Sequence, residues 1–161
     1  MTTPVLMQTQ NDCEIAAIAT ATGKAYEETA AAFTPLPAID PIRGNPEALY
    51  LALVRLALWK KNITWSMLET HQATPGKTVI LIHNPETPTL LQHWIVLAGY
   101  SPDGFSCYWG YPLIAGRDAA LPVFVDTAKM KDLFLRGWPN CAFEISPDTL
   151  WMRIKRRLGF L

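Results

Sequence analysis

Several features that would direct this sequence to large protein classes are absent or scarce. Its 161 residues include only 3 cysteines, none in a CxxC spacing, so neither a disulfide framework nor a thiolate metal site is expected. The 14 basic and 14 acidic residues balance, which argues against nucleic acid as a partner. Gly76-Lys77-Thr78 lacks the upstream glycine and following helix of a phosphate loop, so no nucleotide cofactor is expected.

Membrane and export signals are also lacking. No apolar run reaches the ~18 residues that span a bilayer, so no integral membrane segment is expected. The opening MTTPVLMQTQND has no basic residue ahead of an apolar core, so we see no secretory signal. With 50% hydrophobic and 17% charged residues, the chain is typical of one compact domain. We therefore expect a cytoplasmic protein, where thiols stay reduced.

The first half of the chain has the pattern of helices. Asp12 is a suitable cap for an alanine-rich run that stops at Gly23, a common residue at helix ends. Pro46 suits the first turn of a longer helix that closes on Lys60 and Lys61. Helices are expected at 11–22, 25–33 and 46–61.

The second half has short β-branched and aromatic runs that favour strands. Ser101-Pro102-Asp103-Gly104 is a turn that joins two of them in an antiparallel hairpin. Strands are expected at 63–68, 78–83, 94–100, 105–111 and 142–145, and helices at 127–135 and 147–158. Helices followed by an antiparallel sheet indicate an α+β fold.

Cys13 is the candidate nucleophile because it stands at the expected start of the first helix. Thiolate is the attacking species, and the helix dipole and unpaired N–H groups of a first turn favour it. We therefore expect a lowered pKa for this thiol. A free cysteine that only fills space in the core is the alternative interpretation.

A catalytic thiol also needs a histidine from another element. His93 opens the run HWIVLAGY, which has the composition of a central strand, and it is the candidate base. A structural histidine at a strand end is the alternative interpretation. His83 ends the preceding strand and competes for the same role, whereas His71 falls in a polar loop.

An oxyanion donor is the third requirement of acyl transfer. Gln8 and Gln10 lie just upstream of Cys13, where a glutamine amide can point at the developing charge. Surface glutamines are also common in N-terminal segments, so the glutamines support a catalytic site only together with Cys13 and His93.

The segment MQTQNDCEIAAIATATGKAYEE resembles the nucleophile segment of papain-like cysteine peptidases. It is most similar to the bacteriocin-leader, or double-glycine, peptidases and their small phage and bacterial relatives. Those share a Gln, an Asp-Cys, an alanine-rich helix, a Gly and a second helix with a Tyr-Glu-Glu-like start. The later TVILIH and HWIVLAGY resemble two strands of that family, and the resemblance covers roughly Val5 to Tyr111.

The resemblance implies a papain-like fold, with N-terminal helices packed on an antiparallel sheet. It implies a cofactor-free hydrolase in which Cys13 is the nucleophile, His93 the general base and Gln8 the oxyanion donor. The substrate would be a peptide or protein, cleaved through an acyl-enzyme intermediate. A bacterial or phage origin is also implied, with a place in the cytoplasm or, for a phage protein, in the virion.

Three positions depart from the family's pattern. Met7 stands where the family usually has its glutamine, with Gln8 one residue later. Glu14 follows Cys13 where a small residue is common, and a carboxylate there opposes thiolate formation. The family orients its histidine with an Asp about 16 residues later, where this chain has Trp109-Gly110-Tyr111. Among the carboxylates that follow His93, Asp103 falls in the hairpin turn, and Asp118 and Asp126 come later in the chain.

The end of the chain combines a basic strip with an apolar strip. We expect a hydrolase domain over 1–146 and a basic amphipathic helix over 147–161. Arg153 and Arg157 belong to the basic strip, and Trp151 and Ile154 to the apolar one. Such a helix packs on its own domain, lies on a membrane surface or docks onto a protein partner.

Two functions of different classes follow from the sequence. The first is a cysteine peptidase, or a related thiol-dependent amide hydrolase, with a Cys-His dyad. The second is a catalytically inactive papain-like module with a structural or partner-binding role, for example in a phage particle. It is motivated by the missing orienting Asp, by Glu14 and by the C-terminal helix. A thiol acyltransferase on the same scaffold is a third hypothesis.

Overall fold

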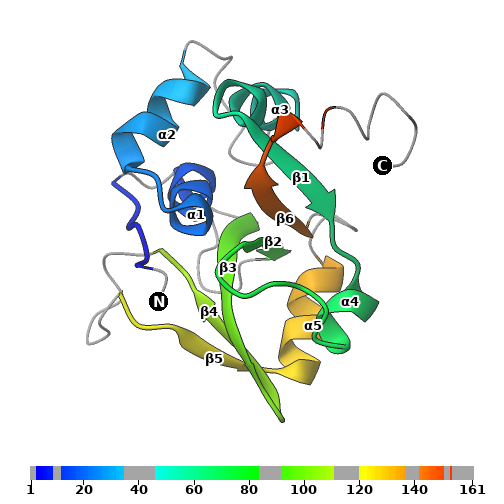
Figure 1. The fold of residues 1–161 in the computed structure, drawn as a ribbon. Helices are drawn as coiled ribbons and strands as arrows, with labels where there is room; N and C mark the ends of the chain where they lie inside the picture. Colours follow the sequence, from blue (N-terminus) through cyan, green and yellow to red (C-terminus); the bar gives the residue numbers. More distant parts are fainter. Residues whose placement is uncertain are drawn as a thin grey trace.

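The computed structural model describes residues 3–8, 12–34, 46–83, 92–110, 120–136, 142–150 and 153. The described elements combine helices with one antiparallel sheet, which confirms the predicted α+β class (Figure 1). Their order is α1 (Cys13–Thr22), α2 (Tyr26–Phe33), α3 (Pro46–Arg55), β1 (Leu58–Asn62), α4 (Trp65–Glu69), β2 (Thr78–His83), β3 (Gln92–Ser101), β4 (Gly104–Tyr108), β5 (Val123–Asp126), α5 (Thr127–Arg136) and β6 (Ala142–Pro147).

Helices cover both faces of the described six-stranded sheet, whose order is β1-β6-β2-β3-β4-β5 (Figure 1). Strands β2 and β3 are therefore apolar on both faces. The side chains that pack with α1, α2 and α3 include Val79, Leu81, Trp94 and Val96. Those that pack with α4 and α5 include Ile80, Ile82, Ile95 and Leu97.

Helix α1 lies centrally, between α2 and strand β3 (Figure 1). Most of its side chains are buried, and the small Ala16, Ala17 and Ala19 let its backbone approach its neighbours closely. The helix ends at Gly23, which has the left-handed φ of 70°. The predicted start and end of this helix are confirmed to within two residues. The expected capping by the Asp12 side chain was wrong, because this carboxylate makes no capping hydrogen bond to the helix and accepts from Gln8 and Tyr26 instead.

Two predicted elements were wrong. The expected helix 46–61 ends at Arg55, and Leu58–Asn62 is the edge strand β1, paired with β6. The chain turns at Ala57, which has a φ of 53°. The basic Lys60 and Lys61 complement a helix end in sequence, but here they lie on an exposed sheet edge, where charge discourages further pairing.

The expected strand 63–68 is also wrong, because helix α4 occupies most of that segment. The Thr64 side chain accepts a hydrogen bond from the main-chain N–H of Met67 at 3.3 Å and so caps this helix. Strand β5 was not predicted at all. The predicted strands at β2 and β6 and the hairpin between β3 and β4 are confirmed.

The expected C-terminal helix is described only at its beginning. Pro147 belongs to β6, and the main-chain N–H of Asp148 donates to the carbonyl of Ala57 at 2.8 Å. A helical hydrogen bond joins Arg153 N–H to the Thr149 carbonyl at 3.1 Å, and Arg153 also pairs with Asp148. Residues 151–152 and 154–161 lie outside the described part of the chain.

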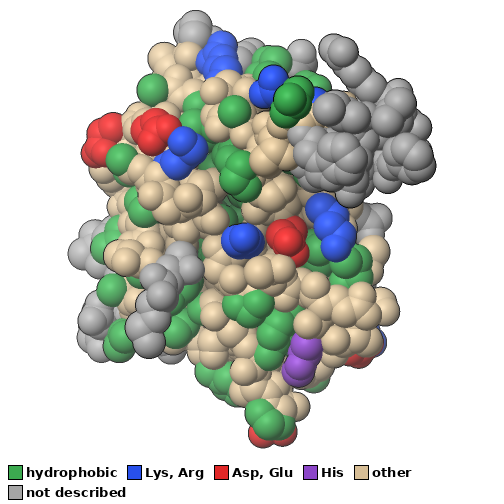
Figure 2. Space-filling model, viewed as in Figure 1, with side chains coloured by type: hydrophobic (Ala, Val, Ile, Leu, Met, Phe, Trp, Pro, Cys, Tyr) green, Lys and Arg blue, Asp and Glu red, His purple; other side chains and the backbone are tan. Residues whose placement is uncertain are grey.

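Side chains of both charges occur on the face of the molecule drawn in Figure 2, with apolar side chains between them. Within the described ranges, no helix is of the length and apolarity that a bilayer crossing requires.

Candidate active site

The candidate nucleophile lies where β3 extends beyond its neighbour β4. Strand β4 ends at Tyr108, opposite Val96, so the main chain of His93 and Trp94 has no β4 partner. Cys13, the first residue of α1, fills this place and packs against the core between α1 and the sheet. Its sulfur accepts a hydrogen bond from the main chain of Trp94, the residue directly after His93.

The pKa of the Cys13 thiol is raised to about 11, so the expected lowering was wrong. Burial is the largest cause, since a thiolate loses its hydration there. The main-chain hydrogen bonds from Trp94 and Glu14 lower the pKa, but the negative charges of Glu14 and Asp12 raise it again. The helix start thus supplies an N–H group that lowers the pKa of the thiol, as expected, but desolvation raises that pKa by more.

Two buried carboxyl groups flank Cys13 in sequence. Asp12 accepts hydrogen bonds from the main-chain N–H of Gln8 at 2.9 Å and from the hydroxyl of Tyr26. Glu14 is 5% exposed, and its Oε2 has no hydrogen-bond partner among the described atoms. Burial raises the pKa of Glu14 to about 8, so this carboxyl holds its proton at neutral pH.

His93 is completely buried. Its Nε2 lies 2.6 Å from the main-chain carbonyl oxygen of Trp109, and its ring stacks beside the Trp109 ring with centroids 5.9 Å apart. Burial lowers the pKa of His93 to about 4, and the bond to Trp109 opposes that shift only in part. The imidazole is therefore neutral at physiological pH.

The structure brings Cys13 and His93 to the same stretch of β3 but gives them different partners. Cys13 packs against the core on the α1 side, whereas His93 stacks on Trp109, which belongs to the core on the α5 side. Within the described residues, no hydrogen bond joins the two side chains. Their shared neighbour is the peptide group between His93 and Trp94.

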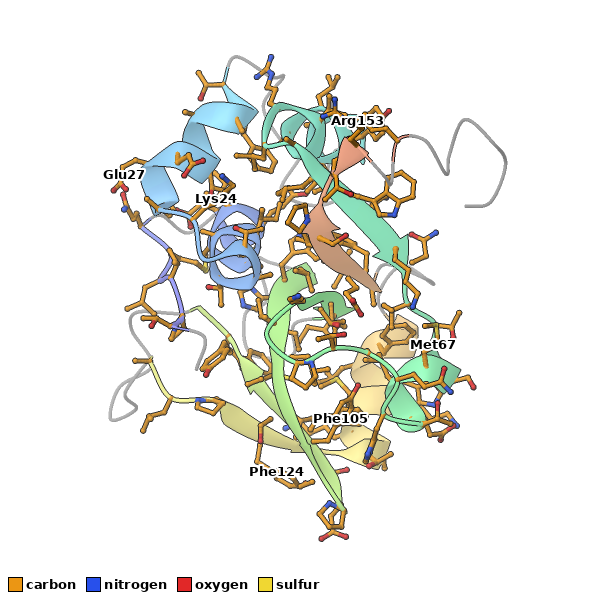
Figure 3. The ribbon with its side chains drawn as sticks, viewed as in Figure 1. Lys24, Glu27, Met67, Phe105, Phe124 and Arg153 are labelled. Atoms are coloured by element: carbon orange, nitrogen blue, oxygen red, sulfur yellow. The ribbon has the colours of Figure 1, made fainter. Side chains whose placement is uncertain are left out.

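Gln8 is exposed, and its amide donates to Glu27 of α2 at 3.4 Å. Figure 3 shows Glu27 at the outer side of α2. The neighbouring Met7 is buried, and its main-chain N–H donates to the Gly110 carbonyl at 2.8 Å. The segment before Cys13 is therefore joined to the segment after β4. Gln10, the other glutamine considered, lies outside the described residues.

The competing residues lie elsewhere. His71 is exposed and stacks on Tyr100, away from β3's first residues. Asp103 lies in the hairpin turn at the far end of β3, and Asp126 pairs in register with Gly104 at that same end. The side chains of His83 and Asp118 are not among those described.

Two main-chain groups of this site were not predicted from the sequence. The N–H of Trp94 faces Cys13, and the carbonyl of Trp109 faces His93. Only the spacing of 16 residues between His93 and Trp109 pointed to the second, because it equals the family's distance to its orienting Asp.

No group of metal-binding side chains occurs among the described residues. A surface hollow of about 500 Å³ lies beside the C-terminal end of α1, between that end and the turn that contains Lys77. Cys13 stands at the other end of α1, so this hollow is separate from the candidate site.

Comparison with solved structures shows which proteins share this fold. The peptidase domain of Streptococcus ComA, a bifunctional ABC transporter of a quorum-sensing pathway, has a TM-score of 0.67 at 12% identity, covering 91% of this chain and 99% of that domain. The peptidase domain of Streptococcus mutans ComA has a TM-score of 0.60 at 12% identity, covering 90% and 99%. A double-glycine-motif protease from an AMS/PCAT transporter, solved with its leader peptide, has a TM-score of 0.56 at 14% identity, covering 90% and 91%.

Two of these structures are peptidase domains and the third is a double-glycine-motif protease, as the resemblance implied, and the papain-like fold is thereby confirmed. No protein-family model matches the sequence, and no curated protein matches it. At 12–14% identity the likeness establishes the fold, so the chemistry has to be argued from the residues of this chain.

Proposed function

We propose that this papain-like chain is a cysteine peptidase, with Cys13 as nucleophile and His93 as general base. The observation that carries the proposal is the contact of the Cys13 sulfur with the main chain of Trp94, the residue after His93. The fold supports it, because peptidase domains of this fold match over nearly their whole length. Residues 1–146 would form the catalytic domain, and 147–161 the basic helix.

In the proposed reaction the thiol is neutral until a substrate carbonyl reaches it. As the sulfur attacks the carbonyl carbon, its proton passes to His93, and the carbonyl oxygen becomes an oxyanion. Collapse of this intermediate breaks the C–N bond, and His93 returns the proton to the leaving amine. Water, activated by the same imidazole, then hydrolyses the thioester and restores the thiol.

Gln8 is the proposed oxyanion donor. Its main chain is fixed by Asp12 at 2.9 Å, whereas its amide makes only a long, exposed hydrogen bond to Glu27. Release of that bond requires only side-chain rotation. A Gln8→Ala variant should lower kcat and leave KM little changed. A Glu27→Gln variant changes only the surface carboxylate that accepts from the Gln8 side chain, so its effect on kcat should be small.

The substrate class we propose is a peptide or protein segment. A related protease was solved with a leader peptide and acts on a double-glycine motif, so peptides with a Gly-Gly pair are the first to test. The bacterial or phage origin and the cytoplasmic or virion location stay predictions.

The test is cleavage of such peptides by the purified chain, followed by mass spectrometry. Cleavage should be lost in Cys13→Ala and His93→Ala and retained in Cys107→Ala, whose thiol is fully buried in β4. Cleavage that persists in Cys13→Ala would overturn the proposal. An added amine acceptor that appears in the product would instead assign acyl transfer.

The second candidate is a partner-binding module without catalysis. It is favoured by the raised pKa of Cys13 and by the buried Glu14 beside it, both of which oppose thiolate formation. If no peptide is cleaved, and Cys13→Ala binds a peptide or protein partner with unchanged Kd, this candidate replaces the first.

A further inference from the structure

The contact between His93 and Trp109 determines which ring nitrogen holds the proton. A carbonyl oxygen only accepts hydrogen bonds, so the 2.6 Å approach of Nε2 to the Trp109 carbonyl requires a proton on Nε2. In a neutral imidazole, Nδ1 is then the acceptor nitrogen. The bond lies inside the protein, since His93 is 0% and Trp109 8% exposed.

The carbonyl of Trp109 is held by the chain on both sides. It follows directly on β4, which is paired with β3 up to Tyr108. Gly110 follows with a φ of 70°, a conformation that side-chain-bearing residues rarely adopt. The Gly110 carbonyl in turn accepts the N–H of Met7 at 2.8 Å, which fixes this turn to the segment before Cys13.

We propose that the main-chain carbonyl of Trp109 is the group that orients His93, in the place where a carboxylate would be expected. This inference rests on the proposed function, in that it takes His93 as the base. Trp109 is then a positioning residue that acts through its backbone, and Gly110 is required for the direction of that carbonyl.

A neutral acceptor has a consequence that a carboxylate does not. It selects one tautomer and one ring orientation, as an orienting Asp does, but it adds no negative charge to stabilise an imidazolium. The base is therefore a neutral imidazole with Nδ1 as its acceptor nitrogen. The Trp109 side chain contributes stacking, and its identity matters less than its carbonyl.

Nitrogen-15 NMR of the histidine ring tests the tautomer directly. His71→Gln and His83→Gln leave His93 as the one histidine of the chain. We expect the Nε2–H tautomer, neutral from pH 6 to 9, and the same result in the Cys13→Ala background. An Nδ1–H tautomer, or an imidazolium at pH 7, would overturn the inference.

Variants separate the carbonyl from the side chain. Trp109→Phe keeps the carbonyl and should keep the Nε2–H signal, whereas Gly110→Ala strains the turn and should give mixed tautomers. A Cβ at Gly110 would meet its nearest atoms at 3.8 Å, which is ordinary contact, so the backbone is what this substitution strains. Gly99→Ala, with open space and no positive φ, is the matched control. A Gly110→Ala spectrum identical to that of Gly99→Ala would contradict the proposal.

An ester in place of the Trp109–Gly110 peptide bond weakens the Trp109 carbonyl as an acceptor and also removes the N–H of Gly110, while both side chains stay unchanged. Cys107 allows ligation of a synthetic 107–161 segment that carries this ester, with the all-amide ligation product as control. We expect the Nε2–H resonance to move upfield and kcat to fall at least tenfold at little-changed KM. An unchanged resonance would count against the inference, whereas the expected resonance in a protein that cleaves no peptide would overturn only the proposed function.

Discussion

The two halves of the candidate site differ in where their carboxyl groups lie. Beside Cys13 there are two buried carboxyl groups, Asp12 and Glu14, and both raise the pKa of the thiol. His93 instead binds a neutral main-chain carbonyl, that of Trp109. A thiolate–imidazolium pair requires the reverse, with positive charge near sulfur and negative charge near the imidazole. This site therefore rests as a neutral thiol and a neutral imidazole.

The largest expected effect is on the Cys13 side and concerns stability. The pKa of Glu14 is raised from 4.5 to about 8, so the native state keeps a proton that the unfolded state has lost in that window. This stability is full below pH 4.5 and is lost as pH rises to about 8. At about 1.4 kcal/mol per pKa unit, the loss is on the order of 5 kcal/mol.

Urea unfolding at several pH values measures that loss. In Glu14→Gln the fall in unfolding free energy between pH 5 and 8 should largely vanish, whereas the exposed Glu69→Gln should keep it. An equal fall in both variants would show that Glu14 ionises normally, and the contrast between the two halves would disappear.

The His93 half should show the opposite dependence. Burial lowers the pKa of His93 from 6.5 to about 4, so between these values the unfolded state binds a proton and the native state does not. Stability is full above pH 6.5 and falls as pH drops to about 4, by on the order of 3 kcal/mol. The fall in unfolding free energy between pH 6.5 and 4 should largely vanish in His93→Gln and persist in the exposed His71→Gln. If the unfolding free energy of the wild-type chain does not fall over this pH range, the lowered pKa of His93 is refuted.

A smaller effect is expected on thiol reactivity. Glu14→Gln removes the larger of the two carboxylate influences on Cys13, and Asp12→Asn the smaller. Iodoacetamide should therefore label Cys13 about threefold to tenfold faster at pH 9 in Glu14→Gln, and less than that in Asp12→Asn. Cys107, which is 0% exposed, is the internal control in the same mass spectrum. Slower labelling in Glu14→Gln would reverse the sign we assign to that carboxyl.

The smallest effect tests how the segment before Cys13 is held. Tyr26 donates its hydroxyl to Asp12, which also accepts the N–H of Gln8. Tyr26→Phe should lower the free energy of unfolding by about 1–2 kcal/mol and speed hydrogen exchange at the main-chain N–H of Gln8. Tyr50→Phe, 58% exposed on α3, should do neither. Unchanged exchange at Gln8 would mean that other contacts hold this segment.

Local sequence patterns predicted those helices, strands and turns whose conformation is set by their own residues. The alanine-rich run after Asp12, the Gly23 stop and the Ser101–Gly104 turn carry their conformations in the sequence, and all three are confirmed. Strand β1 is different, because its apolar and basic residues also suit a helix end. Pairing with β6, more than 80 positions along the chain, decides for a strand.

The strand runs and the Gly23 helix stop are local patterns that predict an α+β fold, and the resemblance to the double-glycine peptidases adds the papain-like arrangement and the candidates Cys13 and His93. The electrostatics of the site depend on tertiary packing, which no local pattern specifies. Burial raises the pKa of Cys13 against the helix dipole, and the chain turn at Gly110 aims the Trp109 carbonyl at His93. Every residue has a main-chain carbonyl, so no residue pattern marks the one that a fold turns toward a histidine.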